Sequence, residues 1–181
     1  MKKEVDKKRA CRLINSGNLI LVSCSYKDKD NITTCAWHSP CSHTPACLLV
    51  ALAKKHLSSE LIRKSKEFII NIPSWQLKDK AVFCGSNSGR DIDKFQKAPL
   101  TREKALKLSK ASKIKECIAN IECSLIDIKE IGDHFLFFGE PVYAEVVEGI
   151  FDFDNIVWKE EADLLFHFGG KFFAKQGPFI S

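Results

Sequence analysis

Residues 31–58 read NITTCAWHSPCSHTPACLLVALAKKHLS, and this stretch holds the buried strand around which the predicted sheet is built. It predicts a loop, then a polar and aromatic turn, then a strand over residues 46–53, and finally the start of a helix. Short hydroxyl side chains, one large planar ring and two cations lie along it: Thr33, Thr34, Ser58, Trp37, Lys54 and Lys55. These residue types together suit a ligand that carries both a flat aromatic part and an anionic group.

Apolar runs and alternating patterns on both sides of this stretch predict further strands. Five segments show them: residues 19–24, 67–72, 117–126, 134–147 and 164–174. The first two are short and rich in strand-forming residues, and the third alternates apolar and polar side chains, which indicates a half-buried strand. A bend at residues 139–141 and a break at Gly169 and Gly170 interrupt the last two.

Helices are expected in three places. They are residues 59–65, where Ser58 and Ser59 cap the first turn, residues 75–83, which have helical spacing, and the basic segment 101–112. Six or more strands with few helices predict a mainly β protein, built as a barrel or a sandwich.

Length and composition predict one globular domain over residues 1–181, with a basic arm at residues 1–10 and a tail at residues 175–181. The 45% hydrophobic and 28% charged content is ordinary for such a domain and allows a sizeable core. No apolar run approaches a membrane span, and the basic start lacks the apolar core of a signal peptide. We therefore expect a cytoplasmic protein with no membrane partner, whose eight cysteines stay mostly reduced.

The net charge of +5 is concentrated in two segments. Residues 1–9 carry five cations and two anions, and residues 102–115 carry six cations and one anion. Basic patches of this kind can bind nucleic acid, but no nucleic-acid-binding motif accompanies them. We therefore interpret them as solvated faces and expect no nucleic-acid partner.

Several motifs follow one another along the chain. Asn31-x-x-Thr34-x-x-Trp37-His38 precedes the buried strand, and Lys55-His-x-Ser58-x-Glu60-Leu-Ile then leads to Glu67-Phe-x-x-Asn71-Ile-Pro73. Ser88-Gly-Arg-Asp-x-Asp-Lys-Phe95 is followed by Glu116-Cys-x-Ala-Asn-x-Glu-Cys123 and by Gly132-Asp-His134. In this order the motifs resemble the flavin reductase-like family, and within it the flavoredoxin branch, over residues 12–173.

This resemblance implies an FMN-binding split β-barrel of Greek-key type with a few peripheral helices, assembled as a homodimer with cofactor sites near the interface. It also implies that electrons pass from NAD(P)H or a reduced carrier through FMN to a flavin, a metal complex or a small oxidant. By motif position, the expected cofactor-binding residues are Asn31, Thr33, Thr34, Cys35, Ala36, Trp37, Lys55, Ser58, Ser88, Gly89, Arg90, Lys94 and His134. Among these, His134 is the candidate catalytic residue, as a hydrogen-bond donor to the flavin ring.

Each of these positions also has a simpler structural interpretation. A lone Trp37 is more often a core side chain, and residues 88–90 alone more often form a surface turn. Residues 91–94 suit a solvated helix start, and His134 can simply begin a strand. His167, between two phenylalanines, is interpreted as a structural or interface histidine rather than an acid–base catalyst.

Cysteines and histidines gather within residues 35–47, which raises a zinc site or a thiol-based redox sensor as alternatives. The group comprises Cys35, His38, Cys41, His43 and Cys47. Its spacing contains no CxxC pair, and Cys47 falls in a strand expected to be buried, so we expect no metal.

Two further classes of function stay open beside the reductase. One is a non-catalytic electron carrier that holds FMN and exchanges electrons with protein partners, and the other is the thiol or metal sensor. The chain contains no GxGxxG fingerprint, so a nicotinamide donor is expected to bind transiently over the flavin.

Overall fold

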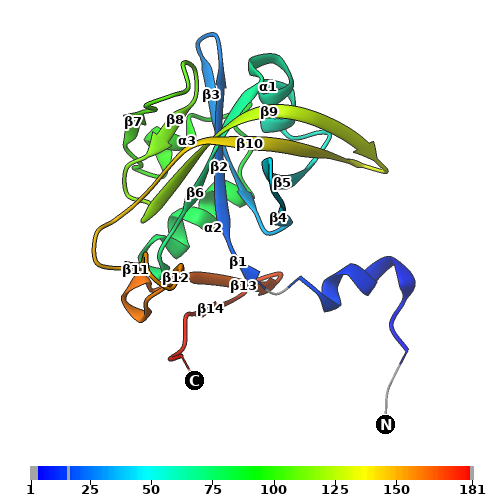
Figure 1. Cartoon of the computed structure of the whole chain (residues 1–181). Helices are drawn as coiled ribbons and strands as arrows, with labels where there is room; N and C mark the ends of the chain where they lie inside the picture. The colour runs from blue at the N-terminus through cyan, green and yellow to red at the C-terminus, as the bar shows by residue number, and fades with distance from the viewer. Residues whose placement is uncertain (1–3, 16, 180–181) are drawn as a thin grey trace.

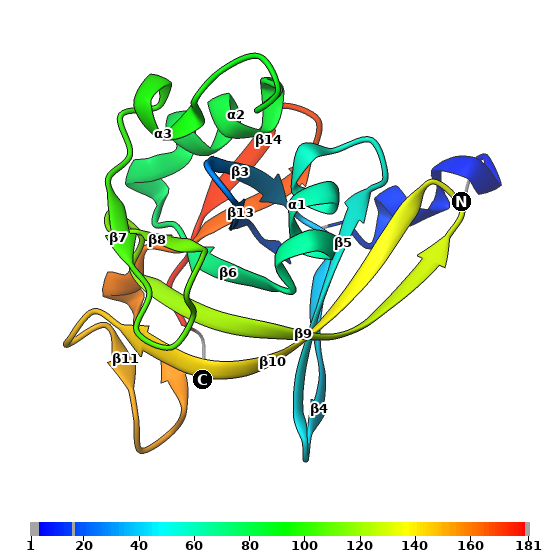
Figure 2. The same ribbon diagram turned by 90° about the horizontal axis from the view of Figure 1, so that it is seen from above.

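The computed structural model describes residues 4–15 and 17–179 of the chain. Its body is a seven-stranded antiparallel sheet in the order β3-β2-β6-β9-β10-β5-β4, which curls strongly in Figures 1 and 2. The strands are β2 (Ile20–Tyr26), β3 (Lys29–Cys35), β4 (His38–His43), β5 (Ala46–Ala53), β6 (Glu67–Ile72), β9 (Ala119–Ile131) and β10 (His134–Val146). The expected mainly β fold class is therefore confirmed.

Smaller elements surround this sheet (Figure 1). The helices are η1 (Lys7–Leu13), α1 (Leu57–Ser65), η2 (Trp75–Leu77), α2 (Lys78–Ser86), α3 (Lys94–Lys97) and η3 (Glu160–Ala162). A three-stranded sheet contains β1 (Gly17–Asn18), β13 (Leu165–Gly169) and β14 (Phe172–Lys175). There are also two two-stranded sheets among the described residues: β7 (Arg102–Lys104) pairs with β8 (Ser112–Ile114), and β11 (Phe151–Asp152) pairs with β12 (Val157–Trp158). Among the described residues, no helix is long and apolar enough to cross a membrane.

Strand β2 separates the two main hydrophobic clusters, so both of its faces are buried. Ile20 and Val22 belong to the cluster that includes residues of α1, whereas Leu21 belongs to the cluster that includes residues of α2 and α3. Because side chains alternate along a strand, the continuous apolar run of β2 lets α1 pack on one face and α2 with α3 on the other. The sheet therefore places the starts of α1 and α3 near one another through β3.

The predicted helix over residues 101–112 is wrong. The segment forms β7, a loop over residues 105–111, and β8. Glu122 accepts hydrogen bonds from the main-chain amides of Leu106, Lys107 and Leu108, and Glu67 accepts them from those of Ser109, Lys110 and Ala111. In a helix these amides would donate to main-chain carbonyls of the same segment. Here they donate instead to two buried carboxylates of the sheet. The first half of β9, expected to be half-buried, is consequently buried on both faces.

Three expectations within residues 31–58 are also corrected. Residues 31–35 belong to β3 rather than to a loop, because their backbone pairs with β2. Ser58 and Ser59 lie inside α1 instead of capping it, since the N-cap residue is His56 and no side chain caps the helix. Burial along β5 alternates, so this strand is fully covered on one face only.

Candidate functional site

A basic cavity of about 360 Å³ lies between β3, the start of α1 and the segment after α2. Seven of the thirteen expected cofactor-binding residues line it: Asn31, Thr33, Thr34, Lys55, Ser88, Gly89 and Lys94. The volume is within the range of small-molecule sites. The fold therefore brings residues of three separate motifs, within residues 31–38, 55–62 and 88–95, together around one cavity.

Lys94 supplies an uncompensated positive charge to this basic cavity. Its side chain is only 6% exposed, and Nζ donates to the carbonyl oxygens of Ile32 at 2.8 Å and Cys84 at 2.6 Å. No described carboxylate forms an ion pair with it, and desolvation lowers the pKa of the Lys94 ammonium. An ammonium has three donors and is expensive to bury alone, so this position favours an anionic ligand.

A hydroxyl and amide network forms the wall behind Lys94. Asn31 Nδ2 donates to Ser58 Oγ at 2.9 Å, and the hydroxyls of Thr33 and Ser58 are 2.6 Å apart. Ser58 is fully buried, so it positions Asn31 and Thr33 rather than lining the cavity itself. A Cβ on Gly89 would collide with Asn31 Oδ1, which explains why this wall requires a glycine.

Lys55 adds further positive charge at the start of α1, and His56 stands next to it as a polar side chain. Both residues line the basic cavity, and α1 begins beside them at Leu57. Desolvation, followed by the charges of Lys94 and Lys55, lowers the pKa of His56. The amide end of α1 adds the positive pole of the helix dipole. His56 was not among the expected site residues, although it stands inside the Lys55-His motif.

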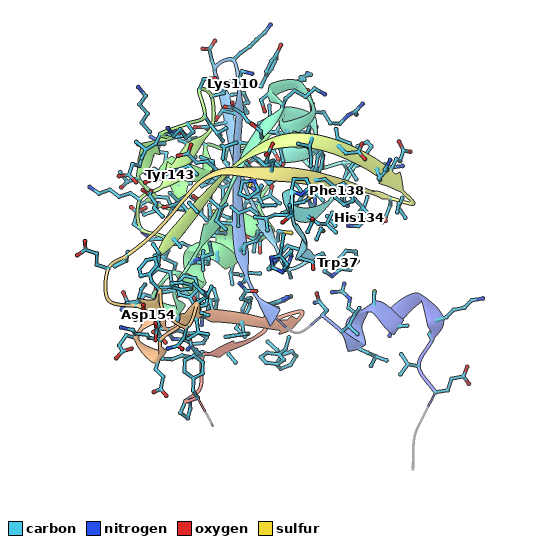
Figure 3. All side chains as sticks on the ribbon, in the orientation of Figure 1. Trp37, Lys110, His134, Phe138, Tyr143 and Asp154 are labelled. Atoms are coloured by element: carbon cyan, nitrogen blue, oxygen red, sulfur yellow. The ribbon has the colours of Figure 1, made fainter. Side chains whose placement is uncertain are left out.

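Trp37 and His134 form a second element of the site. Their ring centroids are 5.0 Å apart with an angle of 32° between the planes, and Figure 3 shows both side chains on the same side of the sheet. Trp37 Nε1 donates to Asn15 Oδ1 at 2.8 Å, and His134 Nδ1 is 2.6 Å from Asp133 Oδ1. Trp37 is 38% exposed and is therefore a surface aromatic residue, not a core one. His134 also lies close enough to His56 to contribute to its lowered pKa.

Two more of the expected residues, Cys35 and Arg90, also lie outside the basic cavity. The Cys35 thiol points into the core, where Sγ lies 3.2 Å from the carbonyl oxygen of Trp37 and 3.8 Å from that of Ala51. Burial raises the pKa of this thiol to about 12, so it is chemically inert near neutral pH. Arg90 is exposed and pairs with Glu60 at 3.1 Å, outside the cavity wall.

An adjoining cavity of about 540 Å³ shares Thr34, Gly85 and Ser86 with the basic cavity. Its other walls come from Ala36, the start of α2 and the β13–β14 hairpin, which contributes His167, Lys171 and Phe173. Sequence patterns assign the hairpin no site role, because its contribution depends on the sheet with β1 that folds it toward β3. A Cβ on Gly85 would lie 3.2 Å from Thr34 Cβ, so the helix packs closely there.

Residues 12–174 match the family model of the flavin reductase like domain. The chain belongs to this family. It is 36% identical to an uncharacterized protein of Archaeoglobus fulgidus, over 65% of the chain and 66% of that protein. It is 27% identical to the flavoredoxin of Desulfovibrio vulgaris, with a TM-score of 0.87 over 100% of this chain and 96% of that one.

The fold is also shared with an FMN-binding protein of Thermus thermophilus, which is 21% identical, with a TM-score of 0.86 over 100% of this chain and 98% of that one. The expected resemblance and the split-barrel fold of the flavin reductase-like family are thereby confirmed. Within the described residues, no group of three or more His, Cys, Asp or Glu side chains is placed to hold a metal ion.

Proposed function

We propose that the chain binds FMN, with its phosphate and sugar chain in the basic cavity. The observation that carries this proposal is Lys94, a buried cation with no ion-pair partner among the described residues, beside the hydroxyls of Thr33 and Ser88. A phosphate monoester carries close to two negative charges and several acceptor oxygens, which fits Lys94, Lys55 and the amide end of α1. Asn31 and Thr33 suit the sugar hydroxyls.

We assign the flavin ring to the side of the site formed by residues 33–36, Trp37 and His134. Bound FMN supplies the redox chemistry, because its ring system takes up and releases electrons. His134 Nε2 has the role of exchanging a proton with the ring, since Nδ1 is bonded to Asp133 and the ring orientation is fixed by that bond. The Trp37 ring contacts the imidazole, with ring centroids 5.0 Å apart, and so restricts its rotation.

We propose further that the protein is an oxidoreductase that receives electrons from NAD(P)H or a reduced carrier and passes them to a flavin, a metal complex or a small oxidant. The adjoining cavity supports a dinucleotide donor, because it opens beside Thr34 and is lined by the cation Lys171 and by Lys78, which pairs with Asp79 at 3.5 Å. Steady-state oxidation of NADH and NADPH by the FMN-loaded protein tests this step. If the protein binds FMN but does not oxidise NADH or NADPH, it is an electron carrier rather than a reductase.

Riboflavin should bind at least about a hundredfold more weakly than FMN, because hydrogen bonds to charged groups contribute about 1.5–3 kcal/mol each and the phosphate makes at least two. Fluorescence titration of the protein with each flavin measures the difference. Equal affinities would refute the phosphate site at Lys94 even if the flavin ring still binds.

We also propose a homodimer, in which the C-terminal hairpin is buried. Phe168 and Phe172 are 54% and 75% exposed on β13–β14, and Phe179 beyond them is 57% exposed. Apolar surface gathered in this way is typical of an interface. Light scattering at micromolar concentration should give twice the chain mass, and Phe172→Asp should give a monomer. Leu106→Asp, at an exposed position between β7 and β8, should leave the dimer intact, and a monomeric wild-type chain would contradict the proposal.

A further inference from the structure

The hairpin of β4 and β5 brings two cysteines together at the edge of the sheet. Ser42 pairs with Cys47 and Pro40 pairs with Leu48, so Cys41 is an extra residue between two register positions. In such a bulge two consecutive residues of one strand face a single residue of the other. Cys41 therefore lies next to the Ser42–Cys47 pair. Figure 2 shows this hairpin extending away from the body of the protein.

The two thiols, defined here as the hairpin dithiol, are in contact but differ in exposure. The Cys41 side chain is exposed, with Sγ 3.7 Å from the carbonyl oxygen of Ser39, whereas Cys47 is only 8% exposed. The Cys41 thiol lies close enough to Cys47 to contribute, after desolvation, to the raised pKa of that thiol. Ser42, which follows Cys41, is the Cα partner of Cys47, and paired residues in antiparallel strands have Cα atoms about 4.5–5.5 Å apart. Cys41 is thus one residue away from a position at the separation that a disulfide spans.

The other described cysteines lack this combination. Five of them are buried: Cys24, Cys35, Cys84, Cys117 and Cys123. Cys11 is exposed on η1, in a separate part of the chain, and forms no disulfide in the structure. The hairpin thus joins an accessible thiol to a covered one, which is the arrangement that thiol–disulfide exchange requires.

We propose that Cys41 and Cys47 form a reactive dithiol that low-molecular-weight disulfides oxidise to an intrachain disulfide. The Cys41 thiolate attacks one sulfur of the incoming disulfide, forms a mixed disulfide and releases the first thiolate. The Cys47 thiolate then attacks Cys41 Sγ and expels the second thiolate. The protein loses two electrons and two protons, and the small disulfide is reduced to two thiols.

The order of these two steps follows from the surroundings of the thiols. Desolvation, followed by the neighbouring Cys41 thiol, raises the pKa of Cys47, which makes it the poorer first nucleophile. Once Cys41 is held in a mixed disulfide, its sulfur is the electrophile that the Cys47 thiolate attacks. This chemistry is independent of FMN and concerns residues outside the basic cavity.

Intact mass measurement after treatment with oxidised glutathione tests the proposal, with Cys11→Ser as the background for every variant. The Cys11→Ser protein should lose two hydrogen atoms, and dithiothreitol should restore them. Adding Cys47→Ser should trap one glutathionyl group on Cys41, because the resolving thiol is gone. Adding Cys41→Ser should abolish both products.

Differential alkylation with tandem mass spectrometry locates the bond, and buried Cys35 on the same proteolytic peptide serves as the internal unreacted control. The proposal is overturned if the Cys11→Ser protein accumulates the same glutathionyl adduct as the Cys47→Ser variant and forms no intrachain disulfide. It is equally overturned if the disulfide persists in the Cys41→Ser variant, because another pair of cysteines would then be responsible. Thermal unfolding of each variant confirms that the fold is kept.

Discussion

Lys94→Met is expected to weaken FMN binding by at least about a hundredfold, because it removes the buried cation that would contact the phosphate and with it charge-assisted hydrogen bonds of about 1.5–3 kcal/mol each. Riboflavin affinity should change far less, since riboflavin has no phosphate to lose. The substitution leaves the carbonyl oxygens of Ile32 and Cys84 without their donor, but it also removes a desolvated charge, so these effects on the fold oppose one another. Fluorescence titration with both flavins measures the two affinities.

The matched control is Lys97→Met, which removes an exposed lysine at the other end of α3. It should leave both affinities unchanged, since residue 97 does not line the basic cavity. A Lys94→Met protein that binds FMN as tightly as the wild type, with the same preference over riboflavin, would show that the phosphate is held elsewhere. If both flavins are lost together with a large fall in melting temperature, Lys94→Arg restores the charge and separates folding from binding.

Glu122→Gln should lower the free energy of unfolding by about 3–5 kcal/mol, and the melting temperature by roughly 10 °C. The Glu122 carboxylate is completely buried and accepts from the amides of Leu106, Lys107 and Leu108 at 2.6, 2.7 and 2.9 Å. A glutamine at this position loses the charge and turns an NH₂ group toward amide donors, so at least one buried N–H loses its partner. Urea unfolding followed by circular dichroism measures the change.

Glu130→Gln is the control on the same strand, because Glu130 is exposed and pairs only with the Lys54 side chain at the surface. Surface ion pairs contribute little, so this variant should unfold close to the wild type. Equal stabilities of the two variants would contradict the view that residues 105–111 are held by Glu122. FMN affinity should stay unchanged in both variants, since neither residue lines the basic cavity.

The sequence by itself determined the main strands and the family. The apolar runs of β5 and β6 and the alternation of β9 are local patterns, because successive side chains of a strand point to opposite faces. That β6 and the first half of β9 are buried on both faces does not follow from these patterns. Motif order was also sufficient to identify the flavin reductase-like resemblance, which the family match over residues 12–174 confirms. Seven of the expected site residues meet in one cavity, since β3, the start of α1 and the segment after α2 all contribute to its wall.

Only the tertiary structure decided where the remaining polar groups lie. Residues 101–112 have helical composition, yet their amides bind two carboxylates from strands far away in the sequence, and local propensity contains no information about those partners. The burial of Lys94, the contact of Trp37 with His134, and the placement of Cys41 near Cys47 depend in the same way on strand register and on packing between distant segments. Spacing along the chain determines which residues of one strand or helix share a face. Which side chains of other elements contact that face depends on strand register and tertiary packing.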